Sequence, residues 1–221
     1  MTTLNSRGAA CCAPTARQAT PWAIAAGKRA ASLPQWLTQA GAMAGFVAAI
    51  LLSNYALQNF PNVKLFDMLV FLAGYSLGFR RGAAVAAAAW LVYGNFNPFG
   101  PSGMPLLLVL MASEVGYALA GAMARRLLQP SRITGLLPSK ASLVFAIAAL
   151  VSTLAYDFAT NVYTGLSWAA LAGSSEYARW IGVSLFNPGA LHFMAAHLSS
   201  NLVFFVSLAP IAIVAARRLS K

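Results

Sequence analysis

Two polar residues one helical turn apart, Asp157 and Asn161, stand inside one of the longest apolar runs of the sequence. Residues four apart share a face of a helix, so this carboxylate and this amide would point the same way. His197 and Asn201 repeat the spacing in another apolar run, and Glu114 stands within a third. Such groups bind ligands through charge and hydrogen bonds. Because the chain has only four acidic residues, two of them in apolar surroundings predict a binding site.

The composition indicates which elements must position these residues. Of the 221 residues, 59% are hydrophobic and 9% are charged, which is more apolar than a soluble domain of this length. We therefore predict an all-α integral membrane protein with six transmembrane helices and both termini in the cytoplasm. Residues 1–35 are predicted to be a disordered basic cytoplasmic tail, and residues 36–218 a six-helix membrane domain. The predicted spans are 36–58, 65–79, 82–95, 104–127, 141–165 and 190–215.

The placement of basic residues favours six spans over five. The second and third spans have roughly 15 residues each against the ~20 that a straight crossing needs, so one kinked helix could replace both. Only Arg80, Arg81 and Gly82 separate them. With six spans, thirteen basic residues fall on the side of the termini and two, Lys64 and Arg179, on the other. This asymmetry is typical of a protein in the cytoplasmic membrane, and it explains the net charge of +11 without a nucleic-acid partner.

Counting along the spans places the polar residues in one layer of the bilayer. Asp157 lies about 12 Å, and Glu114 about 15 Å, below the outer end of its predicted span. His197 and Asn201 lie about 10 and 16 Å deep in the last span. The outer ends of the first and third spans add further polar side chains. We predict a substrate pocket open to the outside and lined by Glu114, Asp157, Asn161, His197, Asn201, Asn54, Tyr93 and Asn97.

Structural roles are an alternative for each of these residues. Asn161 and Asn201 could bridge neighbouring helices by hydrogen bonds, as polar side chains in membrane helices often do. His197 could be a core histidine that is paired with Asp157 or Glu114. The tyrosines of these spans could serve packing or interface anchoring instead of ligand binding.

A stripe of small residues follows the first span. Ala40, Ala44 and Ala48 fall at every fourth position, with Gly41 and Gly45 beside them. Such a smooth surface lets another helix approach closely. The approaching helix could belong to the same bundle or to a partner subunit.

Several of these features together resemble a known family. They are the short spans in "FLAGYSLGFRRGAAVAAAAWLVYGNFNPFG", the pair in "YDFATN", the closing "HLSSNLVFF" and the alanine stripe. In these features residues 36–218 resemble the substrate-binding S component of an energy-coupling factor (ECF) vitamin transporter. The resemblance implies a subunit that captures a vitamin-like micronutrient and docks on a membrane coupling subunit driven by two ATPase subunits. It implies that Ala40, Ala44 and Ala48 contact the coupling subunit.

The sequence also argues against several chemistries. Nickel and cobalt members of that family bind metal through a histidine directly after the initiator Met, whereas this chain begins Met-Thr-Thr-Leu, so no metal is expected. No phosphate-binding G-x-x-x-x-G-K-[ST] motif is present, so ATP hydrolysis would belong to another chain. The sequence has no H-E-x-x-H motif, and its single G-x-S-x-G match, residues 74–78, lies in a predicted apolar span instead of a strand-to-helix turn. We therefore expect neither an enzyme nor a cofactor. The adjacent Cys11 and Cys12 suit neither an ordinary disulfide nor a zinc site.

Two other functional classes stay open at this level. One is a stand-alone proton-coupled carrier, in which buried carboxylates would relay protons. The other is an intramembrane enzyme built from Glu114, Asp157 and His197. For a binding protein, two carboxylates in the pocket would suit a ligand that carries a positive charge or several hydrogen-bond donors.

Overall fold

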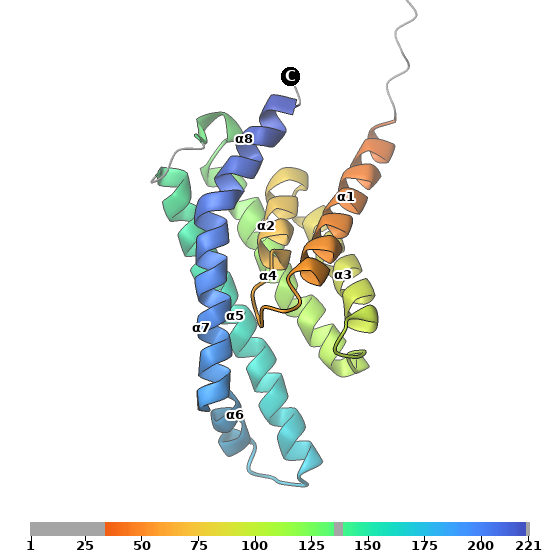
Figure 1. Ribbon diagram of the computed structural model, residues 1–221, viewed down its shortest axis with the longest axis vertical. Coiled ribbons are helices and arrows are strands. Elements are labelled where there is room, and N and C mark those ends of the chain that lie inside the picture. Colours follow the sequence, from red (N-terminus) through yellow and green to blue (C-terminus); the bar gives the residue numbers. More distant parts are fainter. Residues whose placement is uncertain (1–33, 135–138, 220–221) are drawn as a thin grey trace, which may run out of the picture. The chain divides into compact units, whose positions relative to one another are not determined.

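The computed structural model describes residues 34–134 and 139–219, and every regular element within these ranges is a helix (Figure 1). The predicted all-α class is confirmed for this part of the chain. The chain divides into two units, Met1–Gln35 and Trp36–Lys221, and only the second is described below. Almost all of the predicted basic tail, with Cys11, Cys12 and the first four residues, lies outside the described residues.

Four of the helical segments are long and apolar enough to cross a membrane. They are α1 (Gln35–Ala56), α4 (Met104–Leu127), α5 (Lys140–Leu171) and the run Pro188–Leu219. The last run consists of α7 (Pro188–Val203), a π-helical turn η3 (Phe204–Leu208) and α8 (Ala209–Leu219). The shorter elements are α2 (Phe66–Leu77), α3 (Phe79–Phe96), η2 (Pro130–Arg132) and α6 (Tyr177–Phe186). Lengths and composition are therefore those of a multi-pass membrane protein.

The second and third predicted spans are two helices that meet at Gly78. The sequence predicts the break at residues 80–82, but α2 ends at Leu77, and Arg80 and Arg81 lie in the first turn of α3. Gly78 has φ +88°, which a residue with a Cβ atom rarely adopts, so glycine fixes the position of the break. The 12 residues of α2 cover about 18 Å, less than the hydrocarbon thickness of a bilayer. Six complete crossings stay a prediction.

The fifth helix is longer than its predicted span. It continues through Gly165 and ends at Leu171, close to Gly173, whose φ of +59° suits a helix terminus. Its 32 residues cover about 48 Å. Asp157 therefore lies about 21 Å from the end of the helix, not 12 Å as predicted. The separate helix α6, which follows it, has no counterpart among the predicted spans.

The core is centred on α2, of which nine residues are buried. A helix that is buried on all sides is covered by its neighbours, here mainly α3 and α4. The ring of Phe71 lies 5.1 Å from that of Phe145 on α5 and 4.9 Å from that of Phe205 in η3. Pro210 follows η3, and because proline lacks an N–H and clashes with the carbonyl four residues earlier, the wider π turn accommodates it.

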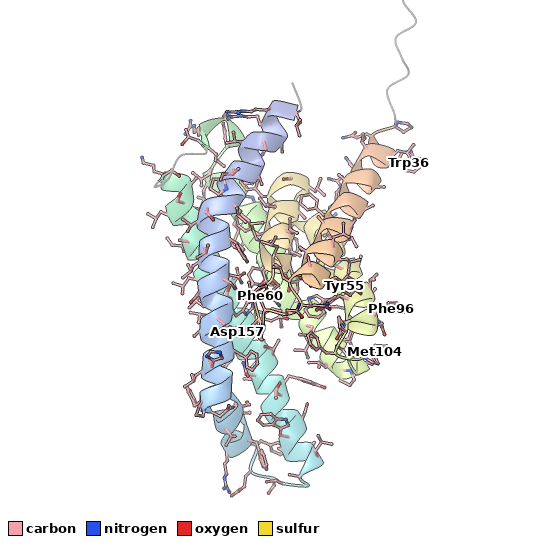
Figure 2. The ribbon with its side chains drawn as sticks, viewed as in Figure 1. Trp36, Tyr55, Phe60, Phe96, Met104 and Asp157 are labelled. Atoms are coloured by element: carbon pink, nitrogen blue, oxygen red, sulfur yellow. The ribbon has the colours of Figure 1, made fainter. Side chains whose placement is uncertain are left out.

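By contrast, α1 contributes little to this core. Only Ile50 and Asn54 of its 22 residues are buried. Its C-terminal end is fastened to α3, where the hydroxyl of Tyr55 donates to the carbonyl of Phe96 at 3.0 Å (Figure 2). The rest of α1 is largely exposed, up to Trp36 at its start.

Candidate ligand-binding site

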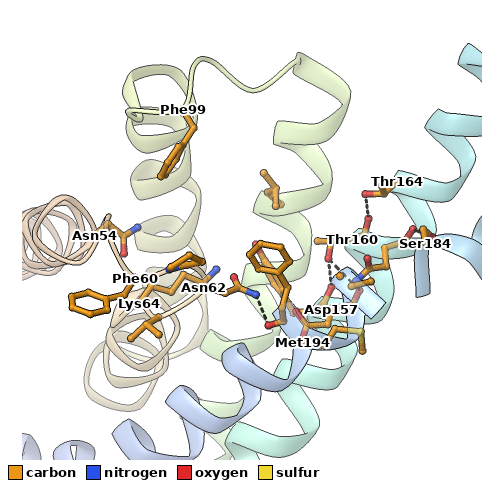
Figure 3. A pocket seen from close by; sticks show the side chains of 18 of the residues that line it. Asn54, Phe60, Asn62, Lys64, Phe99, Asp157, Thr160, Thr164, Ser184 and Met194 are labelled. Carbon is orange, nitrogen blue, oxygen red and sulfur yellow. Dashed lines mark hydrogen bonds between the residues drawn. The ribbon is translucent and has the colours of Figure 1, made fainter. Parts of the chain in front are cut away.

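A pocket of about 640 Å³ opens between the end of α1, the loop that follows it, and helices α3 to α7 (Figure 3). This volume lies within the range of small-molecule sites, roughly 300 to 1,000 Å³. Four of the residues predicted to bind substrate line the pocket, namely Asn54, Tyr93, Asp157 and Asn161. The other four, Glu114, His197, Asn201 and Asn97, do not line it. The structure therefore separates the predicted set into a pocket wall and supporting residues.

Behind the pocket wall, His197 lies between two carboxylates. Its Nδ1 atom is 2.7 Å from Oδ1 of Asp157, and its Nε2 atom is 2.5 Å from Oδ2 of Asp67. When both carboxylates are ionised, each ring nitrogen must donate a hydrogen bond, so the ring is an imidazolium. All three side chains are buried, which makes this mutual pairing essential because an unpaired charge there would be costly. His197 thus orients Asp157 from α7.

Asn201 extends this network to one further helix, α4. Its amide nitrogen lies 2.7 Å from Oδ2 of Asp67 and 2.9 Å from Oγ1 of Thr153. The hydroxyl of Tyr117 on α4 donates to the same Thr153 oxygen at 3.0 Å. These fully buried contacts join α2, α4, α5 and α7. Asn201 is thus an interhelical hydrogen-bonding residue, the alternative that its sequence position left open.

Glu114 is fully buried and lies against one wall residue of the pocket. The indole N–H of Trp90 donates to its Oε2 atom at 3.2 Å, and Trp90 itself lines the pocket. The other oxygen, Oε1, has no hydrogen-bond partner among the described residues. Glu114 therefore fixes the orientation of an aromatic wall instead of facing the pocket.

Asn97 shapes the loop between α3 and α4. Its side-chain amide donates to the carbonyl of Gly100 at 2.8 Å, and its oxygen accepts from the N–H of Phe99 at 2.9 Å. Asparagine commonly stabilises turns through such local bonds. Phe99, which this turn holds, lines the pocket.

Lys64 and Asp67 are functional candidates that sequence reasoning missed. The Nζ atom of Lys64 lies 3.5 Å from Oδ1 of Asp67 and 4.7 Å from the centre of the ring of Tyr156. Burial by itself lowers the pKa of an ammonium, but the carboxylate of Asp67, followed by Tyr156, Glu114 and Asp157, raises the pKa of Lys64 above its ordinary value. Lys64 is therefore a cation at neutral pH, and it lines the pocket.

A signal for this pair exists in the sequence. The spacing of Lys64 and Asp67, three residues apart at the start of an apolar helix, is that of a helical ion pair. The distribution of basic residues predicts only that Lys64 lies on the side of the membrane opposite the termini. Three of the four acidic residues of the chain, Asp67, Glu114 and Asp157, in fact lie at or behind the pocket.

The loop that carries Lys64 is fastened to α7 by Asn62. The side-chain amide of Asn62 donates to the carbonyl of Phe193 at 2.8 Å. The φ of Asn62 is +59°, a left-handed conformation that asparagine tolerates better than most residues. This bond holds the loop against the helix that also carries His197, and it sets where Lys64 enters the pocket.

The alanine stripe on α1 is exposed along its whole length. Ala40, Ala44 and Ala48 are all open, and a Cβ atom at Gly41 or Gly45 would meet no other atom within 4 Å. Within the described part of the chain, the stripe thus has no covering helix. Packing inside the same bundle, one of its two predicted roles, is not seen there.

Comparison with known proteins assigns this chain to no family. No protein-family model, curated protein or solved structure matches this chain. Among the described residues, no group of three or more His, Cys, Asp or Glu side chains is arranged to hold a metal ion. In the residues that the structure describes, the fold and the site together define an all-helical protein with several helices able to cross a membrane and a polar, aromatic-walled pocket between them.

Proposed function

We propose that this chain is the substrate-binding membrane subunit of an ECF-type ABC importer for a vitamin or related micronutrient in the cytoplasmic membrane. The observation that carries the proposal is the pocket. It has the volume for a small organic molecule, and Asp157 and Asn54 each place on its wall a buried oxygen that has no hydrogen-bond partner among the described residues. A donor on a bound ligand would satisfy such oxygens, whereas in its absence they are costly.

The orientation of the pocket supports uptake from outside. The basic ends of α4, η2 and α8 lie together, since Arg217 donates to the carbonyl of Pro130 at 2.8 Å and Arg125 lies over the ring of Tyr75 at 5.4 Å. The pocket is built instead from the end of α1, the end of α3 and the start of α7. If the arginine-rich end faces the cytoplasm, as the distribution of basic residues predicts, the pocket opens outward.

The exposed stripe on α1 supports a partner in the membrane. Small residues at every fourth position favour close helix contact, and no described helix occupies the stripe. We propose that Ala40, Ala44 and Ala48 dock on the coupling subunit. Two ATPase subunits would then supply the energy, because this sequence has no phosphate-binding loop of its own.

Purification from the native membrane tests this function. We expect a coupling subunit and two ATPases to co-purify with the chain, and mass spectrometry to identify a small molecule retained in the pocket. Ala44→Trp should remove the partner subunits and leave the small molecule bound. Simultaneous loss of partners and ligand in that variant would indicate that the stripe serves folding.

The second candidate is a proton-coupled carrier that works alone. It is favoured by the chain of titratable groups Asp67, His197 and Asp157, which extends from the core to the pocket wall. Reconstitution of the purified chain in liposomes distinguishes the two. Solute accumulation driven by a proton gradient without ATPase subunits would favour the carrier and contradict the importer.

A further inference from the structure

The side of the pocket formed by α5 and α6 presents hydrogen-bond acceptors. The hydroxyls of Thr160 and Thr164 donate to carbonyls one turn earlier in α5, at 3.0 and 2.9 Å. Ser184 of α6 donates to the carbonyl of Asn161 at 2.7 Å. Each hydroxyl has a single hydrogen, which these bonds use, so its oxygen can only accept from a ligand. These three residues and Asn161 all line the pocket.

The strongest acceptor on this side is Asp157. Its Oδ1 atom pairs with His197, whereas Oδ2 is buried and has no hydrogen-bond partner in the part of the chain that the structure describes. The side chain is only 6% exposed and belongs to the pocket wall. Because a charged donor makes the strongest hydrogen bonds to a carboxylate, this oxygen is best satisfied by a protonated nitrogen.

Lys64, on the loop before α2, presents hydrogen-bond donors to the pocket instead of acceptors (Figure 3). An ammonium has three donor hydrogens. Its paired carboxylate oxygen, on Asp67, is 3.5 Å away, longer than a direct charge-assisted bond of about 2.8 Å. No hydrogen bond joins the ammonium to any of the described residues. A ligand anion would supply the missing acceptors.

The charges at the wall cancel one another. When Asp67 and Asp157 are both ionised, Lys64 and the imidazolium of His197 balance their charges. Glu114 lies behind Trp90 and forms none of these ion pairs. A ligand with a net charge would leave one charge uncompensated in a largely desolvated site. A ligand that carries one charge of each sign would pair with both ends of the pocket and keep the balance.

We infer that the pocket binds a zwitterionic small molecule, with its protonated nitrogen against Asp157 and the acceptors of α5 and α6, and its anionic group against Lys64. This inference rests on the proposed function, since it specifies the substrate class of the same site. The body of the ligand lies between aromatic side chains that line the pocket, which include Trp90, Tyr93, Phe99, Trp168 and Phe193. An aromatic or other flat apolar body suits such walls.

Three matched probes test the inference on the full-length purified chain. L-tryptophan carries both charges, tryptamine lacks the carboxylate, and indole-3-propionate lacks the amine. We expect L-tryptophan to bind at least about tenfold more tightly than either analogue in equilibrium binding measurements. Equal affinities, a single-charge probe that binds best, or no binding by any of the three would overturn the inference.

Two variants assign each charge to its residue. In Lys64→Met the advantage of L-tryptophan over tryptamine should fall to about onefold, and in Asp157→Asn its advantage over indole-3-propionate should do the same. Lys140→Met and Glu176→Gln, which remove equal charges from residues outside the pocket, should leave the ranking unchanged. An unchanged ranking in both pocket variants would overturn the inference.

These ratios separate a charge effect from a loss of folding. Each ratio is taken within one variant, so a smaller folded fraction lowers all three apparent affinities equally and leaves their order intact. If neither pocket variant folds, the ranking of the wild-type chain decides. Co-purification of ATPases with a retained ligand of a single charge would overturn this inference while the proposed importer function stands.

Discussion

Removing the carboxylate of Asp67 should destabilise the protein far more than breaking the other ion pair of the same spacing among the described residues. The comparison pair is Arg179 and Glu176, whose charged atoms lie 2.9 Å apart with side chains 74% and 60% exposed. In the pair of Lys64 and Asp67 the atoms lie 3.5 Å apart, but the side chains are 16% and 0% exposed. The shorter distance predicts that the pair of Arg179 and Glu176 contributes more to stability, whereas burial predicts that the pair of Lys64 and Asp67 contributes more.

The magnitude follows from what Asp67→Ala leaves behind. The ammonium of Lys64 loses its counter-charge, and His197 and Asn201 each lose an acceptor. Removing one partner of a buried ion pair costs about 3 to 5 kcal/mol in free energy of unfolding. Glu176→Ala breaks an exposed pair, for which the cost is below about 1 kcal/mol because water and salt screen the charges.

Reversible unfolding in mixed micelles of detergent and SDS would measure both variants against the wild type. We expect Asp67→Ala to lose at least about 3 kcal/mol and Glu176→Ala less than about 1 kcal/mol. Asp67→Asn keeps an oxygen for His197 and separates the loss of the charge from the loss of the acceptor. If Glu176→Ala proves as costly as Asp67→Ala, burial does not govern these pairs, and the structural account of the network is wrong.

Three further predictions concern other parts of the molecule. Ala44→Trp should abolish uptake in cells while ligand binding to the isolated chain stays within about twofold of the wild type, because the stripe is exposed; equal loss of both would contradict a docking role. Gly121→Ala should cost about 1 to 3 kcal/mol in unfolding free energy, because its Cβ would overlap the backbone of α2. The control Gly116→Ala, on the same helix, adds a Cβ that meets no atom within 4 Å and should be neutral or stabilising. Tyr117→Phe should cost about 0.5 to 1.5 kcal/mol by removing the hydroxyl that donates to Thr153, and a cost near zero would mean that this bond is not formed.

Long apolar helices, and pairs of polar residues on one face of a helix, could be predicted from the sequence. The predicted span 104–127 coincides with α4, because a run of this length bounded by proline and arginines has only one helical solution. His197 and Asn201 do share a face, since both contact Asp67. The i, i+4 rule depends only on the helix itself, so it holds without knowledge of the neighbours.

The division between pocket wall and support could not be predicted. Glu114 and Asp157 are both buried carboxylates on long apolar helices, yet one faces Trp90 and the other lines the pocket. This difference depends on the rotation of each helix about its axis relative to its neighbours, which hydrophobic spacing specifies poorly in a chain that is apolar on nearly all sides.

The sequence by itself thus determined the helical class, the apolar elements and the pairs within each helix. Only the tertiary structure brought Asp67 to His197, 130 residues later in the chain, and Lys64 to the wall of the pocket. Contacts between distant residues depend on how whole helices pack, and here the packing is set by the backbone at Gly78 and by the short buried helix α2. Local spacing carries no information on such contacts, because it describes one helix at a time.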